Sequence, residues 1–120
     1  MKAVLFEDND VDSRLLRELF AIHGHHMMTL STPVGALEQI AAEQPDIVLV
    51  DLSLPAMSGL ALVRDLRRFP ATAALQVVAV TAYPARYTNR EIQESGCNAW
   101  LVKPLDTRTV LAQLAQPCID

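Results

Sequence analysis

Asp51 directly follows residues 47–50, an apolar run of the kind that forms a buried strand. Glu7 and Asp8 end a second apolar run, and Lys103 follows a third. Charged side chains placed where buried strands end lie at the edge of a sheet, within reach of a ligand. Three acidic groups and one basic group in such positions are therefore candidates for holding a cation and an anion together.

The carboxylates of Glu7, Asp8 and Asp51 repel one another when they converge, unless a cation lies among them. Mg²⁺ is the hard divalent ion that suits such oxygen ligands in a cell, and phosphate oxygens can replace some of its waters. A carboxylate beside it can then attack phosphorus and form an aspartyl phosphate. The Lys103 ammonium and the Thr81 hydroxyl, which ends another apolar run, would bind the phosphoryl oxygens. These residue types favour phosphoryl transfer to a carboxylate.

The elements that would position these side chains alternate five times between strand and helix patterns. Such repetition predicts an α/β fold, a doubly wound five-stranded parallel sheet with right-handed crossovers and helices on both faces. We expect the flavodoxin-like strand order 2-1-3-4-5, in which ligands lie beyond the carboxyl ends of strands one and three. The expected strands are 2–7, 25–30, 46–50, 76–80 and 99–102, and the expected helices begin near residues 10, 32, 58, 84 and 106.

Two strands differ in polarity in a way that indicates their places in the sheet. The strand at 25–30 is polar and suits an edge, whereas the strand at 46–50 is apolar after its first residue and suits the centre. In the expected order Glu7, Asp8 and Asp51 would converge despite their separation along the chain. We expect one domain spanning residues 1–120, since this length and an apolar content of 51% suffice for a single core.

The helix patterns predict which faces are buried. In the first helix, expected over 10–23, apolar residues recur at helical spacing, at Val11, Leu15, Leu19 and Ile22.

Thr32 is expected to cap the second helix, with Val34 and Ile40 on one apolar face. In the helix expected over 84–95, Ile92 is the one large aliphatic residue, so this helix should be held more loosely than the others.

Composition excludes several classes of function. A net charge of -4, with 10 basic residues scattered along the chain, argues against a nucleic-acid surface. Cys97 and Cys118 lack the spacing of a zinc site or a redox pair, and Cys97 is expected to be a buried apolar residue. His23, His25 and His26 have no acidic or Cys partner at ligand spacing and are expected at the surface.

Targeting signals are also missing from the pattern. No apolar stretch approaches the roughly 20 residues of a membrane span. The first expected strand begins almost at Met1 and leaves no room for a signal peptide. We therefore expect a cytoplasmic protein that binds neither membrane nor nucleic acid directly.

Four separated motifs, which cover essentially the whole chain in order, resemble those of the receiver domain of bacterial two-component response regulators. The motifs are Glu7-Asp8, the segment from Asp51 to Gly59 with Pro55 and Met57, Thr81-Ala82, and Lys103-Pro104. The resemblance implies that Asp51 accepts phosphorus from the phosphohistidine of a histidine kinase or a phosphotransfer protein. It also implies a downstream protein target, and a signalling module instead of an enzyme.

The resemblance assigns roles to single positions. Asp8, Asp51 and the backbone carbonyl of Ser53 would ligate Mg²⁺, and Glu7 would act through a water molecule. Lys103 would pair with the phosphoryl group, and with Asp51 before phosphorylation.

Further roles follow from the same resemblance. Thr81 and the adjacent Ala82 would bind the phosphoryl group, and Thr81 would pull the next loop inward and change the face made by the last two helices and the fifth strand. Pro104 would follow a cis peptide bond. Trp100 stands where the family has a smaller aromatic switch residue that swings between outward and inward positions. Because indole is bulkier, we expect signalling either to rely on backbone movement or to keep Trp100 outward as part of a partner surface. Tyr83 would shield the phosphoryl group from water.

Two other functions compete with this prediction. A phosphatase of the haloacid-dehalogenase type also uses an Asp after an apolar strand, but it needs a second Asp two residues later as a general acid, where this chain has Ser53. A degenerate receiver that serves only for binding is disfavoured because Asp51, Asp8, Thr81 and Lys103 are all present. No output domain is expected after the last helix, so the chain is either a stand-alone receiver or part of a longer protein.

Overall fold

Five parallel strands form one sheet in the order β2-β1-β3-β4-β5, and this confirms the predicted α/β fold and strand order. The computed structural model describes residues 1–7, 10–32, 34–52, 59–81, 88–103 and 108–115. The elements are β1 (Lys2–Phe6), α1 (Asp10–Ile22), β2 (His26–Leu30), α2 (Ala36–Glu43), β3 (Ile47–Asp51), α3 (Gly59–Arg68), β4 (Gln76–Thr81), α4 (Asn89–Ser95), β5 (Ala99–Val102) and α5 (Val110–Ala115).

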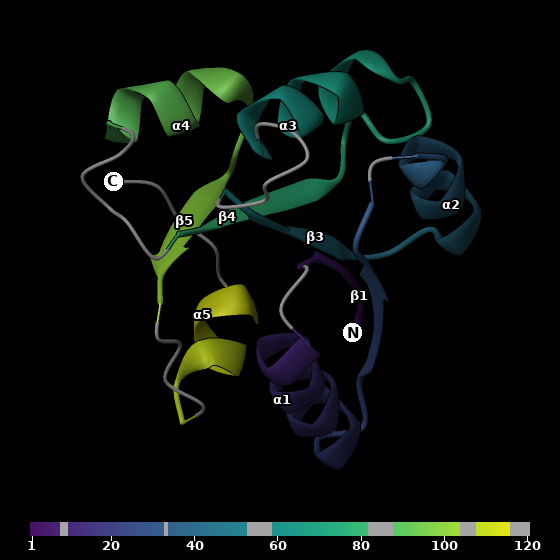
Figure 1. Ribbon diagram of the computed structural model, residues 1–120, viewed down its shortest axis with the longest axis vertical. Helices are drawn as coiled ribbons and strands as arrows, with labels where there is room; N and C mark the ends of the chain where they lie inside the picture. The colour runs from purple at the N-terminus through teal and green to yellow at the C-terminus, as the bar shows by residue number, and fades with distance from the viewer. Residues whose placement is uncertain (8–9, 33, 53–58, 82–87, 104–107, 116–120) are drawn as a thin grey trace.

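The sheet separates two layers of helices (Figure 1): α2, α3 and α4 lie on one face, and α1 and α5 lie on the other. Each face has its own core, because successive side chains of a strand point to opposite faces. On β3, Val48 and Val50 belong to the core under α2, α3 and α4, whereas Ile47 and Leu49 belong to the other. All five residues of β3 are buried, as predicted for the central strand.

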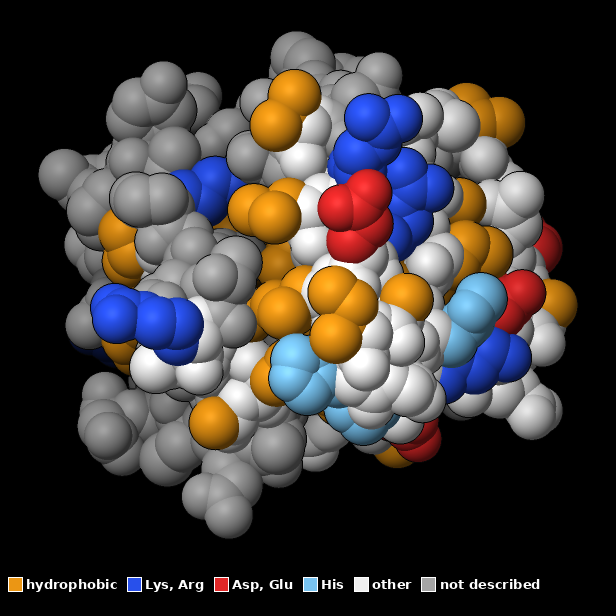
Figure 2. Space-filling model, turned by 90° about the horizontal axis from the view of Figure 1, so that it is seen from below, with side chains coloured by type: hydrophobic (Ala, Val, Ile, Leu, Met, Phe, Trp, Pro, Cys, Tyr) orange, Lys and Arg blue, Asp and Glu red, His pale blue; other side chains and the backbone are white. Residues whose placement is uncertain are grey.

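The apolar spacing in α1 predicted the helix correctly but did not mark its buried side. Val11 is 76% exposed and Ile22 is 79% exposed, whereas Leu16 and Phe20 are buried. Leu16 and Phe20 face the sheet, and of the predicted stripe Leu19 packs beside them as a partly buried residue. Figure 2 views the molecule from the side of α1 and α5, where apolar side chains gather in the middle of the surface.

The predicted start of α2 was wrong. Thr32 accepts a hydrogen bond on Oγ1 from the backbone N–H of Val34 at 3.2 Å, but this bond closes a turn that precedes the helix. Gly35 then adopts a left-handed conformation with φ 71, and the helix begins at Ala36. Val34 is consequently 80% exposed and not on the inner face, whereas Ile40 is buried as predicted.

At their carboxyl ends β3 and β4 each reach one residue further than the sequence predicted, and this affects the candidate site. β3 ends at Asp51 and β4 ends at Thr81, and Asp51 lies in register with Val80. The backbone N–H of Leu52 still donates to the carbonyl oxygen of Val80 at 2.8 Å. Regular sheet geometry therefore fixes the backbones from which Asp51 and Thr81 project.

Among the described helices, none is long and apolar enough to cross a membrane.

Candidate functional site

The candidate residues lie at the carboxyl ends of neighbouring strands. Glu7 follows β1, Asp51 ends β3, Thr81 ends β4 and Lys103 follows β5. Because these four strands are parallel and adjacent, their ends share one edge of the sheet. Backbone hydrogen bonds continue past the strands, since the N–H of Glu7 donates to the carbonyl oxygen of Leu30 at 3.1 Å.

Lys103 connects the two acidic side chains. Its Nζ donates to Oε2 of Glu7 at 2.6 Å and to Oδ2 of Asp51 at 3.0 Å. Both acidic side chains are 3% exposed, and that of Lys103 is 17% exposed. An ammonium group that bridges two buried carboxylates offsets part of their desolvation, because each opposite charge favours the ionised form of the other. Asp51 is therefore held as an oriented, charge-compensated carboxylate.

Thr81 lies at the next strand end and is 3% exposed. Its carbonyl oxygen accepts a hydrogen bond from the backbone N–H of Lys103 at 2.8 Å. Thr81 and Lys103 therefore belong to one continuous backbone ladder between β4 and β5. The Thr81 hydroxyl and the Lys103 ammonium group therefore both lie on the β4 and β5 side of Asp51.

Trp100 lies on β5 and is half-buried. It packs against the core on the α3 and α4 side of the sheet, which includes Ile92 and Cys97. The aromatic side chain therefore lies on the side of the sheet that α2, α3 and α4 cover.

Five of the sequence-predicted site residues lie outside the described part of the chain: Asp8, Ser53, Ala82, Tyr83 and Pro104.

Sequence reasoning did not predict the contact between Lys103 and Glu7. It assigned Glu7 only a water-mediated role at a metal ion, whereas Glu7 accepts the shorter of the two hydrogen bonds from the Lys103 ammonium. The sequence offers one signal for the contact, namely an acidic and a basic residue at the ends of strands that a parallel sheet brings to one edge.

The acidic side chains among the described site residues suit a hard cation. Glu7 and Asp51 contribute carboxylate oxygens, and such oxygens are the ligands that Mg²⁺ prefers. No group of three or more His, Cys, Asp or Glu side chains that could hold a metal ion occurs among the described residues. A complete cation site would therefore need ligands in addition to Glu7 and Asp51.

The family model of the response regulator receiver domain matches residues 3–115. This chain belongs to that family. The predicted resemblance to receiver domains is thus confirmed. A receiver domain is a phosphorylatable module of two-component signalling. Interaction with kinases and with downstream targets is general to such domains.

Known relatives agree with this assignment. This chain is 29% identical over 102 residues to the polar-differentiation response regulator DivK of Brucella ovis. The match covers 85% of this chain and 83% of DivK. It is 29% identical to a CheY-like receiver domain from Methylobacillus flagellatus, with a TM-score of 0.83 and coverage of 96% of both chains.

A third similarity concerns the fold alone. The receiver domain of a sensor histidine kinase from Pseudomonas aeruginosa is 21% identical, with a TM-score of 0.84, and covers 96% of this chain and 94% of its own. That protein was solved with a magnesium ion coordinated in its active-site cleft.

Proposed function

We propose that this receiver domain accepts a phosphoryl group on Asp51 from the phosphohistidine of a histidine kinase or a phosphotransfer protein. The observation that carries the proposal is the position of the Asp51 carboxylate, which is buried at a strand end and held by the Lys103 ammonium at 3.0 Å. A fixed carboxylate loses little freedom on the way to the transition state, so orientation lowers the barrier to attack.

The transfer is a displacement at phosphorus. A bond forms between a carboxylate oxygen of Asp51 and phosphorus, while the bond between phosphorus and the donor imidazole nitrogen breaks. The imidazole leaves with the electron pair of that bond and takes up a proton from water. Charge spreads over the phosphoryl oxygens during this step, and preorganised donors stabilise it.

Lys103 would supply one of these donors. Its ammonium group contacts both Glu7 and Asp51, so a small displacement toward phosphoryl oxygens on Asp51 would keep the contact with Glu7. Glu7 would thus retain the ammonium group near the site while its partner changes from a carboxylate to a phosphoryl group. The Thr81 hydroxyl and the adjacent Ala82 would bind the other side of the phosphoryl group.

Mg²⁺ would be held by Asp51, Asp8 and the backbone carbonyl of Ser53, with Glu7 acting through water. When bound, the ion neutralises charge on the phosphoryl oxygens. The magnesium ion in the related receiver from Pseudomonas aeruginosa supports this assignment. Within the described residues, Glu7 and Asp51 are the chain's own contribution to an oxygen-rich site.

Phosphorylation would act through the face made by α4, β5 and α5. Thr81 would move toward the phosphoryl group, and Trp100, which packs against the core on the α4 side of the sheet, would respond to that movement. Tyr83 would shield the acyl phosphate from water, and Pro104 would shape the turn after Lys103. The partner that reads this face would be a downstream protein, and we expect residues 1–120 to act as one receiver unit in the cytoplasm.

Incubation with acetyl phosphate and Mg²⁺, followed by intact-mass spectrometry, tests the proposal. We expect a stable gain of one phosphoryl group that is lost in Asp51→Asn. Continuous turnover of a phosphoester would instead indicate a phosphatase. A chain that gains no phosphoryl group, and that binds no beryllofluoride with Mg²⁺, would be an interaction module only.

A further inference from the structure

α1 exposes an apolar stripe on the side that faces away from the sheet. A surface helix normally turns its apolar residues toward the core, and α1 does so with Leu16 and Phe20. At about 100° per residue, however, Val11, Leu15 and Ile22 point in the opposite direction. These three residues are 76%, 49% and 79% exposed. α1 is therefore apolar on two opposite sides, of which the sheet covers only one.

Such a concentration of exposed apolar residues does not recur in the described part of the chain. The other large apolar residues exposed there are Val34, which lies before α2, and Val102, which ends β5. Single apolar residues at a protein surface are ordinary, whereas a contiguous group marks an interaction site. Figure 2 shows the side of α1 and α5, on which apolar side chains gather in the middle of the surface. The stripe on α1 is therefore a candidate interaction surface.

Glu18 lies in line with the stripe. Val11, Leu15, Glu18 and Ile22 follow one another at intervals of four, three and four residues. This is the spacing of the residues along which two helices of a coiled coil meet. We call these four residues the α1 seam. The seam is suited to packing lengthwise against another helix.

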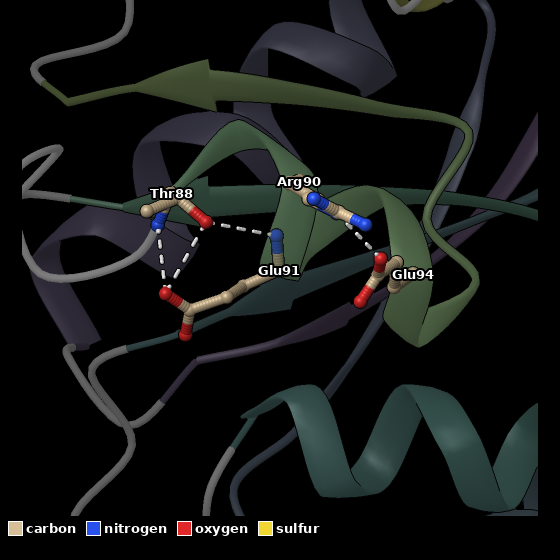
Figure 3. Close-up of polar contacts among 4 residues, drawn as sticks. All are labelled: Thr88, Arg90, Glu91 and Glu94. Carbon is tan, nitrogen blue, oxygen red and sulfur yellow. Dashed lines mark hydrogen bonds and ion pairs between the residues drawn. The ribbon is translucent and has the colours of Figure 1, made fainter.

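The acidic residue of the seam has a basic counterpart four residues earlier on the same helix. Arg14 and Glu18 have the same spacing as Arg90 and Glu94 of α4, where Nε of the arginine lies 2.8 Å from Oε1 of the glutamate (Figure 3). Arg14 and Glu18 are both exposed, but neither has an ion-pair partner among the described residues. One cation and one anion beside the stripe are therefore available to a binding partner.

The seam and these two charges are complementary to a second copy of themselves. In an antiparallel pair of α1 helices, Val11 of each copy meets Ile22 of the other copy, and Leu15 meets Glu18. Arg14, which precedes Leu15, then lies within reach of Glu18 of the other copy. A parallel pair would instead place the two Glu18 side chains opposite each other, where like charges repel. The antiparallel pair therefore provides each Glu18 with an opposite charge.

The surface beside the seam is hollowed. A hollow of about 460 Å³ lies there, and among the described residues it is lined by Val11, Arg14, Leu15, Arg17 and Glu18. Three of these residues belong to the seam, so the hollow is open to side chains that pack along it. Ile22 of the second copy, which meets Val11, is the apolar side chain placed to enter it.

We propose that two copies of this chain associate through α1, in an antiparallel two-fold arrangement held by the α1 seam and by Arg14 against Glu18. The two-fold symmetry makes each contact occur twice. α1 is 13 residues long, or about 20 Å. A face of this length is smaller than the roughly 800 Å² per partner that stable complexes bury, so the dimer is weak and forms at high concentration. The dimer goes beyond the proposed function and does not depend on phosphorylation of Asp51.

Sedimentation velocity on the full, unphosphorylated chain tests the dimer. Between about 10 µM and about 1 mM we expect the average mass to rise from that of a monomer toward that of a dimer. Arg14→Glu and Glu18→Arg should each raise the dissociation constant by about tenfold, because each turns two attractive pairs into repulsive ones. Both residues are exposed, so the substitutions leave the core intact.

Mixing the two variants distinguishes the proposed arrangement from a general effect of charge. Chains with Arg14→Glu and chains with Glu18→Arg should together form a heterodimer of about wild-type affinity, since every pair across the interface is then of opposite charge. Arg17→Glu is the matched control. It makes the same change of charge on the same helix, but at about 100° per residue it lies nearly twice as far around the helix from the seam. Its dissociation constant should stay within about twofold of the wild-type value.

Three results would overturn the dimer. One is a wild-type chain that stays monomeric at the highest concentration. Another is a mixture of Arg14→Glu and Glu18→Arg chains that associates no better than either variant alone, or an Arg17→Glu chain that loses as much affinity as Arg14→Glu. The third is a monomeric chain whose Arg14→Glu variant accepts a phosphoryl group more slowly from a phosphohistidine donor, because the seam would then bind the donor and not a second copy.

Discussion

The ammonium nitrogen of Lys103 lies closer to Glu7 than to Asp51, at 2.6 Å from Oε2 of Glu7 and 3.0 Å from Oδ2 of Asp51. Glu7 therefore accepts the shorter of these two hydrogen bonds from Lys103, and Asp51 accepts the longer. This division matters for chemistry, because the carboxylate proposed to attack phosphorus must give up its contact with Lys103 as the new bond forms.

Lys103→Met should impair both folding stability and phosphorylation. It leaves two buried carboxylates without this counter-charge, and removing one partner of a buried ion pair costs about 3 kcal/mol of unfolding free energy. It also removes a donor to the phosphoryl oxygens, so the phosphorylation rate with acetyl phosphate should fall by about 100-fold. Urea unfolding and phosphorylation kinetics measure the two effects.

Lys2→Met is the matched control for this variant. Lys2 pairs with Glu43 at 3.1 Å, but their side chains are 42% and 34% exposed. A pair this exposed to water contributes about 0–1 kcal/mol, so the control should remain near wild-type stability. Equal losses in the two lysine variants would contradict the electrostatic role given to Lys103.

Glu7→Gln should weaken Mg²⁺ binding without preventing it. The substitution removes one negative charge beside the site and frees Lys103 to pair more closely with Asp51. Loss of such an outer contact lowers metal affinity by about tenfold or more. Titration of Trp100 fluorescence with Mg²⁺ measures the affinity, because Trp100 is the one tryptophan of the chain and lies on β5. Glu38→Gln, at an exposed position of α2, is the control, and an equal affinity in both variants would exclude Glu7 from the cation site.

Gly96→Ala should destabilise the domain more than Gly24→Ala does. Both glycines have positive φ, 114 at Gly96 and 77 at Gly24, so alanine pays about 1–2 kcal/mol of backbone strain at each. Only Gly96 adds a collision with Arg67, since nothing lies within 4 Å of a Cβ at Gly24. Urea midpoints of the two variants isolate that collision. If both lose the same amount of stability, Arg67 must move aside easily, and its packing against Gly96 is unimportant.

Cys97 should behave as an inert thiol in the folded protein. Burial raises its pKa, a hydrogen bond with Ser95 and the charge of Arg67 lower it by less, and the net shift favours the neutral thiol. In a Cys118→Ser background, alkylation at pH 8 should be about 100-fold slower than in denaturant. Fast alkylation of the folded chain would contradict the packing around Cys97.

The same shift predicts a dependence of stability on pH. The unfolded chain loses the Cys97 proton near the usual value of 9.0, before the folded chain does. The unfolded state therefore gains stability first, and unfolding free energy should fall as pH rises above about 9. Cys97→Ala should show a smaller decline over the same range, measured by urea unfolding at successive pH values.

Much of the fold could be predicted because the strand pattern and the chemistry of strand ends are local signals. The apolar run before Asp51 identified the central strand, and the polarity of the strand that ends at Leu30 identified an edge strand. Helix faces were harder, because α1 has two apolar stripes and only tertiary packing selects Leu16 and Phe20 over Val11 and Ile22. The start of α2 depended on the left-handed backbone of Gly35, which side-chain patterns do not reveal.

At the site, the sequence predicted which strand ends would meet but not how the charges would be shared. That Lys103 contacts Glu7 as well as Asp51 depends on the exact positions of three side chains. The hydrogen bonds that Arg67 donates to the carbonyl oxygens of Gly96, Ala73 and Leu75 were not predicted, since backbone carbonyls leave no trace in residue types.

The backbone bond between Lys103 and Thr81 has a consequence for how the domain tolerates change. The N–H of Lys103 donates to the carbonyl oxygen of Thr81 at 2.8 Å. The spacing of their side chains is therefore set by the distance between neighbouring strands of a parallel sheet. Insertions in the connecting segments would leave that spacing intact. A one-residue slip of β5 against β4, in contrast, would point the lysine to the opposite face and abolish the site in a single step.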